Sequence, residues 1–126
     1  MTIQNSNIFS GLNSAQLEAV KCVDGASLII AGAGSGKTRV LTCRIANVIN
    51  LGCDPSRILA LTFTKKAASE MKERIGNLVG GRAARRIYMG TFHSVFIRFL
   101  RDYAHLLGFS KDFTIYDTSD SKSAIK

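Results

Sequence analysis

The glycine-rich run AGAGSGKT, residues 31–38, constrains this chain more than any other stretch. It follows the apolar residues 28–30 and precedes an amphipathic segment from Arg39, which is the strand, turn and helix order of a P-loop. Glycines let the backbone curl so that N–H groups converge on a phosphate, and the helix N-terminus adds partial positive charge. The strict pattern has glycine where this chain has Ala31, a small residue that we expect to be tolerated. A glycine-rich turn with an unrelated lysine is the alternative interpretation.

The P-loop pattern gives roles to individual residues. Lys37 would reach the β- and γ-phosphates of a nucleotide, and the hydroxyl of Thr38 would bind Mg²⁺. We therefore predict Lys37 and Thr38 as catalytic residues, Thr38 as the metal ligand, and ATP and Mg²⁺ as cofactors. The predicted nucleotide-binding residues around them are Gly32, Ala33, Gly34, Ser35, Gly36, Lys37, Thr38 and Arg39.

Composition narrows the class of protein. A length of 126 residues, 46% hydrophobic and 21% charged, is typical of one globular domain. The sequence contains no apolar run long enough to span a bilayer, and its polar start lacks the order of a signal peptide. Cys22, Cys43 and Cys53 have no CxxC spacing, which indicates thiols in a reducing compartment. We expect a cytoplasmic location.

The charge is strongly basic, with 17 Lys and Arg against 9 Asp and Glu and a formal net charge of +8. Within residues 65–101 only Glu70 and Glu73 oppose the basic side chains Lys65, Lys66, Lys72, Arg74, Arg82, Arg85, Arg86, Arg98 and Arg101. Such a stretch favours a polyanionic partner, because neutralised phosphates release counterions. A basic face that is simply solvated is the alternative.

Strand-like and helix-like segments alternate along the chain. Strands are predicted at residues 27–31, 58–63 and 87–89, with a short extended piece at 113–116. Helices are predicted at 14–22, from the P-loop to 51, at 65–79 with Thr64 as N-cap, and at 94–107. Their expected inward stripes are Val40, Leu41, Ile45, Val48 and Ile49; Ala67, Ala68, Met71, Ile75 and Leu78; and Val95, Phe96, Phe99, Leu100, Tyr103 and Leu107.

This β-α-β-α-β-α order predicts an α/β fold with a mainly parallel sheet and right-handed crossovers. Ligand is expected at the carboxyl ends of the strands, where the P-loop lies. Residues 117–120 resemble a helix start, and only 121–126 follow. We therefore expect an incomplete domain that stops as a new element begins.

ATP hydrolysis needs a second, metal-linked carboxylate at a strand end, and a group that orients water. The nearest candidate is Asp117 after residues 113–116, and it lacks a following Glu. No arginine finger stands out, although Arg85, Arg86, Arg98 and Arg101 stay open as candidates. We expect the chain alone to bind nucleotide weakly, with little turnover.

Several stretches together resemble the UvrD/Rep-type superfamily 1 DNA helicases. Residues 12–16 (LNSAQ) are similar to the Q motif, and 36–41 (GKTRVL) continue the P-loop closely. Residues 58–68 (ILALTFTKKAA) resemble motif Ia, and 90–94 (GTFHS) resemble motif Ib. Residues 113–117 (FTIYD) resemble the segment that leads into the inserted 1B subdomain.

The resemblance implies a RecA-like three-layer sandwich, with residues 1–110 in domain 1A and 111–126 entering subdomain 1B. It implies that Gln16 reads the adenine edge, as an amide can; a surface helix residue is the alternative. The DNA path implied by the family contains Phe63, Thr64, Lys65, Thr91 and His93, and at Lys65 the family commonly has Asn. A core role for Phe63 and a capping role for His93 are the alternatives.

The function implied is part of a 3′-to-5′ ATP-dependent DNA helicase. Its implied partners are single-stranded DNA, duplex junctions and the rest of the helicase chain, which would carry the acidic motif, later arginines and second RecA-like domain. Two alternatives remain. One is a small P-loop phosphotransferase, and the other is a nucleic-acid-binding module with a vestigial P-loop.

Overall fold

The computed structural model describes residues 5–115 and 118–125. The chain forms two compact units, Met1–Phe92 and His93–Lys126, and each is described by itself. The elements of the first unit are α1 (Asn5–Phe9), α2 (Ser14–Lys21), α3 (Lys37–Asn50), the 3-10 helix η1 (Pro55–Arg57), β1 (Leu59–Thr62), α4 (Lys65–Val79), α5 (Gly81–Arg86) and β2 (Tyr88–Thr91). Helix α6 (Phe92–Tyr103) leads into the second unit, which continues with η2 (Ala104–Leu107) and α7 (Thr118–Ile125).

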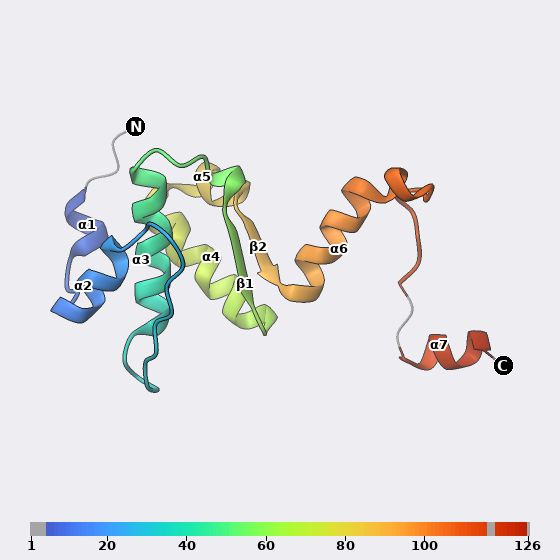
Figure 1. Cartoon of the computed structure of the whole chain (residues 1–126), viewed down its shortest axis with the longest axis horizontal. Helices are drawn as coiled ribbons and strands as arrows, with labels where there is room; N and C mark the ends of the chain where they lie inside the picture. Colours follow the sequence, from blue (N-terminus) through green and yellow to red (C-terminus); the bar gives the residue numbers. More distant parts are fainter. Residues whose placement is uncertain (1–4, 116–117, 126) are drawn as a thin grey trace. The chain divides into compact units, whose positions relative to one another are not determined.

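Strands β1 and β2 form a two-stranded parallel sheet, in which Leu59 pairs with Tyr88 and Thr62 with Thr91. Helices α4 and α5 connect the two strands, so the predicted parallel α/β connection is confirmed. Figure 1 shows α1 and α2 on one side of α3, and α4 on the other side, next to the strands. This is part of an α/β arrangement, and the RecA-like three-layer sandwich stays a prediction.

Two buried clusters hold the first unit together. One joins α3, β1, α4 and α5 through Ile45, Ala60, Met71, Ile75, Ala84 and Ile87. The other packs α1 and α2 on the opposite side of α3 through Ile8, Val20, Val40, Cys43 and Ala46. Helix α3 therefore has apolar contacts on two sides, with α1 and α2 on one side and α4 on the other.

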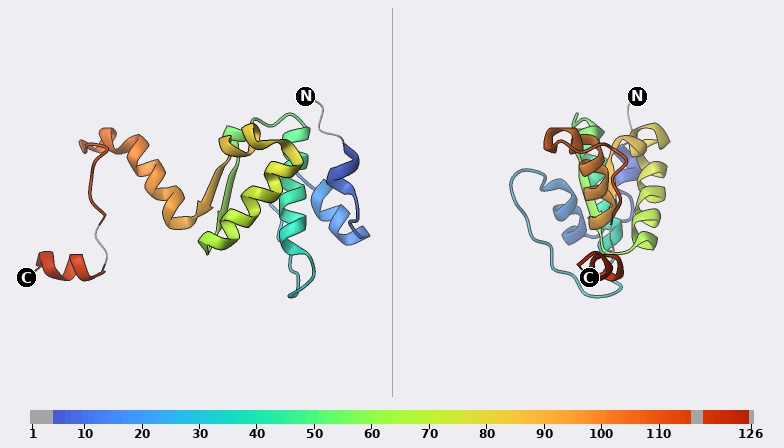
Figure 2. Two further views of the ribbon diagram at one scale, coloured as in Figure 1. Left: turned by 180° about the vertical axis from the view of Figure 1, so that it is seen from behind. Right: turned by 90° about the vertical axis from the view of Figure 1, so that its right-hand side faces the viewer.

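The predicted strand at residues 27–31 is wrong for this structure, because these residues have no regular secondary structure. Leu28 is 85% and Ile30 89% exposed. An apolar run of this kind needs a hydrogen-bonded neighbour strand and a covering layer, and the described residues supply neither. The chain between α2 and α3 instead forms a wide arc (Figure 2, right).

The predicted helix boundaries are largely confirmed. Helix α2 starts after Asn13, whose side chain caps it, and α4 starts after Thr64 as predicted. Gly52, with φ +104°, follows the end of α3. Helix α5 was not among the predicted helices. Gly80 does end α4, with φ +91°, but a helix starts again immediately after it.

The predicted inward stripes are only partly confirmed. In α3 the stripe includes Leu41, which is exposed, whereas Cys43 and Ala46 are buried in its place. In α4 Met71 and Ile75 are buried, but Ala67 is exposed.

The stripe predicted for residues 94–107 is mostly wrong in its burial. Val95 is buried, but Phe96 is 51% and Leu100 50% exposed. Helical periodicity identifies a face that requires cover, and the described residues leave this face open. Gly108, with φ +79°, ends η2, which agrees with the predicted helix end at residue 107. Phe113–Ile115 have no regular structure, and Tyr116 and Asp117 lie outside the described residues. In the part of the chain that is described, no helix is both long and apolar enough to span a membrane.

Candidate nucleotide and nucleic-acid sites

The glycine-rich run forms a tight turn that leads directly into α3. Gly34 and Gly36 have φ of +75° and +81°, the left-handed region that glycine adopts without strain. The hydroxyl of Ser35 donates to the carbonyl of Gly32 at 2.5 Å, which closes the turn. Gly36 is the N-cap of α3 and offers no capping side chain. The first turn of this 14-residue helix therefore has the geometry that favours an anion.

Lys37 and Thr38 are the first two residues of α3, and both are exposed. Gly32, Ala33 and Gly34 are exposed in the preceding turn. The structure thus gathers the predicted phosphate-binding backbone, the lysine and the hydroxyl at one helix N-terminus.

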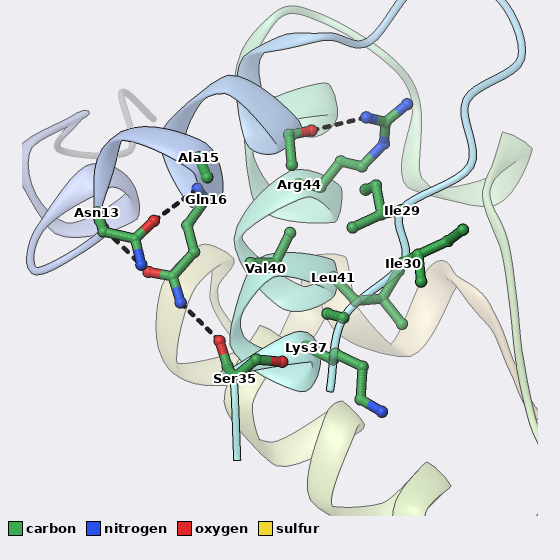
Figure 3. A pocket seen from close by; sticks show the side chains of 12 residues that line it. Asn13, Ala15, Gln16, Ile29, Ile30, Ser35, Lys37, Val40, Leu41 and Arg44 are labelled. Atoms are coloured by element: carbon green, nitrogen blue, oxygen red, sulfur yellow. Dashed lines mark hydrogen bonds between the residues drawn. The ribbon is translucent and has the colours of Figure 1, made fainter. Parts of the chain in front are cut away.

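Gln16 is brought to the same turn from α2. Its Oε1 accepts from the Asn13 N–H at 3.0 Å, and the Asn13 Oδ1 accepts from the Gln16 N–H at 2.9 Å, which is a capping box. The other end of the amide, Nε2, donates to the carbonyl of Ser35 at 2.9 Å (Figure 3). The side chain predicted to read a base therefore bonds to the glycine-rich turn.

A pocket of about 360 Å³ lies beside Gln16 and Lys37, between α2, the arc and α3. Figure 3 shows its lining, with Ile29 of the arc beside Val40 and Leu41 of α3. Ile30 also lines the pocket, but it is 89% exposed. Ligand pockets are typically about 300–1,000 Å³, largely apolar, with a few placed polar groups. The pocket combines such an apolar lining with Gln16, Ser35 and Lys37 at one end.

The pocket also contains Arg44, which the sequence reasoning missed. Its Nη1 donates to the Ala19 carbonyl at 2.7 Å. Lys37, Leu41 and Arg44 are spaced i, i+4 and i+7, which puts them on one face of the helix. This spacing is the sequence signal that would have identified Arg44 as a pocket residue.

Arg39 has a different environment from its neighbours. Its guanidinium donates to the Ser10 carbonyl, and a Cβ on Gly11 would lie 2.8 Å from its Nη2. The side chain thus reaches the turn between α1 and α2. Burial raises the pKa of the Cys43 thiol, and the charge of Arg39 partly opposes this rise.

The carboxyl end of the sheet carries two aromatic rings. Phe63 directly follows β1 and is 91% exposed, and its ring centroid lies 5.5 Å from that of Phe92, which follows β2. Phe92 was not among the predicted residues. Because the parallel register pairs Thr62 with Thr91, the residues after the two strands occupy equivalent positions, and this register was the missing signal.

The remaining predicted DNA residues lie near the same strand ends or follow them in sequence. Thr64 is the N-cap of α4, and its Oγ1 accepts from the Ala67 N–H at 3.1 Å. Lys65 is the first residue of α4 and is exposed, and Thr91 ends β2 with partial burial. His93 is exposed and is the second residue of α6, in the other compact unit.

The metal ligand that the first turn of α3 offers is the hydroxyl of Thr38. The described residues contain no group of three or more His, Cys, Asp or Glu side chains that could hold an ion. Mg²⁺ usually keeps water and phosphate oxygens and needs only one or two protein oxygens. The Thr38 hydroxyl therefore fits Mg²⁺ shared with a bound nucleotide. The other candidate ligand, Asp117, lies outside the described residues.

A glycine-rich turn at a helix N-terminus, in a chain with parallel strands, defines an α/β protein with a candidate phosphate site. Residues 12–126 match the family model of the UvrD/REP helicase N-terminal domain. The chain belongs to the UvrD/Rep helicase family.

Three relatives are ATP-dependent DNA helicases named PcrA. The chain is 51% identical over 118 residues to the protein of Leuconostoc citreum, covering 93% of this chain and 16% of that one. It is 52% identical over 120 residues to those of Staphylococcus aureus strain Mu50 and Staphylococcus epidermidis, covering 94% of this chain and 16% of each. The chain thus spans 16% of the length of these relatives.

Proposed function

We propose that this chain forms the N-terminal, nucleotide-binding part of an ATP-dependent DNA helicase that moves 3′ to 5′ along single-stranded DNA. The observation that carries the proposal is the glycine-rich turn, which ends at the N-terminus of α3 beside the 360 Å³ pocket. Membership of the UvrD/Rep helicase family and the PcrA relatives support the choice of helicase over other nucleotide-binding proteins.

In this proposal the backbone N–H groups of residues 32–38 bind the phosphates of ATP. Lys37 adds a positive charge at the β- and γ-phosphates, and Gln16 faces the adenine edge. The Thr38 hydroxyl is one ligand of Mg²⁺, which neutralises phosphate charge when it is bound. Arg39 connects α3 to the turn between α1 and α2 through its hydrogen bond to the Ser10 carbonyl.

The proposed path of single-stranded DNA crosses the carboxyl end of the sheet. Phe63, extended by Phe92, offers an aromatic face on which a base stacks, and Lys65 offers a charge for a phosphate. Thr64, Thr91 and His93 supply further polar groups. The proposed parent protein acts at duplex junctions in DNA repair or replication in the cytoplasm.

We also propose that residues 1–110 belong to domain 1A and that 111–126 enter subdomain 1B. The exposed residues Leu28 and Ile30 support the view that the 1A part is incomplete, because an apolar segment of a parallel sheet requires further strands as partners. Without them, and without the second RecA-like domain, we expect the 126-residue chain to bind Mg-ATP weakly, to hydrolyse it very slowly and not to unwind DNA.

The test is to compare ATP turnover by the purified chain with turnover by Lys37→Ala. We expect both to lie at background, because in this proposal the metal-linked carboxylate belongs to the rest of the helicase chain. Rapid ATP turnover by the 126-residue chain, abolished by Lys37→Ala, would contradict the proposal that hydrolysis requires the rest of the helicase. Salt-dependent binding of single-stranded DNA with no measurable nucleotide binding would instead favour a nucleic-acid module with a vestigial P-loop.

A further inference from the structure

We propose that Gln16 is a positioning residue for the glycine-rich turn, and that it shapes the phosphate site before any nucleotide base is present. This inference rests on the proposed function, because it concerns the same site. It goes beyond a base-reading role, since it makes the affinity for phosphate alone depend on a side chain of α2.

The first observation is that the amide of Gln16 has a defined orientation. The Asn13 backbone N–H is a donor and therefore requires an oxygen, so Oε1 faces Asn13 at 3.0 Å. The amide nitrogen is then directed at the Ser35 carbonyl, 2.9 Å away. The capping box thus determines which end of the amide meets the turn.

The second observation is where the bond ends. Ser35 lies inside the turn, and its hydroxyl also bonds the Gly32 carbonyl at 2.5 Å. The Gln16 bond spans 19 positions of sequence and connects this exposed turn to α2. Helix α2 packs on α3 through Val20 and Val40. The turn is therefore linked through Gln16 to the same core that holds α3.

The third observation is the close approach at Gly36. A Cβ at this position would lie 2.9 Å from Gln16 Nε2, closer than real Cβ contacts. The amide therefore lies against the backbone of Gly36, the N-cap of α3. In Figure 3 the Gln16 amide lies beside Ser35, and the Lys37 side chain extends away from Gln16.

The chemistry of the amide allows both roles. A glutamine amide has two N–H donors and an oxygen with two lone pairs. One donor and one lone pair are used by Ser35 and Asn13, so a donor and an acceptor site remain for a base. Base contact and positioning of the turn are therefore separable by a ligand that has phosphates and no base.

The experiment measures binding of Mg-ATP and of Mg-tripolyphosphate to the 126-residue chain by calorimetry. Gln16→Met keeps the length of the side chain and removes both hydrogen bonds. Asn13→Ala removes the hydrogen bond from the Gln16 N–H to the Asn13 side chain. It leaves the Gln16 side chain and its bond to Ser35 in place, so it is the control for helix capping.

We expect Gln16→Met to bind tripolyphosphate about fivefold more weakly, the size of one lost hydrogen bond, and Asn13→Ala to bind it within about twofold of the original chain. If Gln16→Met weakens ATP but leaves tripolyphosphate unchanged, Gln16 only reads the base. That result overturns the inference and leaves the proposed function intact. Equal weakening by both variants also overturns it, because helix capping then explains the effect.

Hydrogen exchange of the Ser35, Gly36 and Lys37 amides provides a readout that needs no ligand. Exchange that is faster in Gln16→Met than in Asn13→Ala supports the inference, and equal exchange overturns it. If the original chain binds neither ATP nor tripolyphosphate, the proposed function fails, and exchange alone decides on the positioning role.

Discussion

At the scale of single residues, Gly36 carries two independent constraints. Its φ of +81° disfavours any residue with a Cβ, and that Cβ would also meet the Gln16 amide. We predict that Gly36→Ala lowers the free energy of unfolding by about 1–2 kcal/mol in urea titrations. Gly32→Ala is the matched control, because a Cβ there meets nothing within 4 Å, and it should stay within about 0.5 kcal/mol. Equal losses for the two variants would contradict this account.

A substitution of Phe63 can test DNA binding without a large change in the stability of the fold. Because the side chain is 91% exposed, Phe63→Ala should change the free energy of unfolding by less than about 0.5 kcal/mol. It should weaken binding of an oligothymidine by about 1–3 kcal/mol, the contribution of one stacked base. Fluorescence anisotropy measures this, with Phe109→Ala as the control for loss of another exposed phenylalanine. A core role for Phe63 would show the reverse, a loss of stability with unchanged binding.

At the scale of elements, α4 begins where the sequence predicts because Thr64 supplies its cap. The Thr64 Oγ1 accepts from the Ala67 N–H at 3.1 Å. We predict that Thr64→Ala costs about 1 kcal/mol of stability and that Thr64→Ser restores most of it. Urea denaturation followed by circular dichroism checks this. Identical stabilities of the serine and alanine variants would show that the cap contributes nothing.

A second prediction at this scale concerns the connection between η1 and α5. Asp54 Oδ1 accepts from the Ser56 N–H at 2.9 Å and from its hydroxyl at 2.8 Å, and Arg86 Nη2 donates to both carboxylate oxygens at 2.8 and 3.0 Å. The backbone bond from Ser56, then its hydroxyl and Arg86, lower the pKa of Asp54 below its ordinary value.

The sign of the pH effect follows from that lowered pKa. A depressed carboxyl pKa contributes stability above the unfolded value, and this contribution disappears as the pH falls through the folded value. Stability measured by urea titration from about pH 5 to about pH 2 should therefore fall less steeply in Asp54→Asn than in the original chain. Parallel pH profiles would show that Asp54 is not responsible.

At the scale of the whole molecule, local rules predicted the elements well and their packing less well. Thr64 marks the start of α4 by a short-range hydrogen bond to the Ala67 N–H, so its role could be read from the sequence. The apolar residues 28–30 indicated a strand, but a strand exists only with a hydrogen-bonded neighbour, and no local sequence pattern reports whether one is present. The exposed face of α6 differs from its prediction for the same reason.

The candidate site shows the same division. The turn at residues 33–35 and the start of α3 at Lys37 follow from glycine positions and were predictable. The bond between Gln16 and Ser35 and the pairing of Phe63 with Phe92 depend on tertiary placement, which no local pattern reports.

The measurement that tests the central claim most directly is calorimetric titration of Mg-ATP into the chain, Lys37→Ala and Lys72→Ala. Lys72 lies on the exposed face of α4 and controls for the loss of one positive charge. We predict that the original chain binds Mg-ATP and that Lys37→Ala weakens binding about ten- to hundredfold, as the loss of a charge-assisted phosphate contact does. Lys72→Ala should stay within about twofold. If Lys37→Ala binds Mg-ATP as well as the original chain does, the glycine-rich turn is not a nucleotide site and the account is wrong.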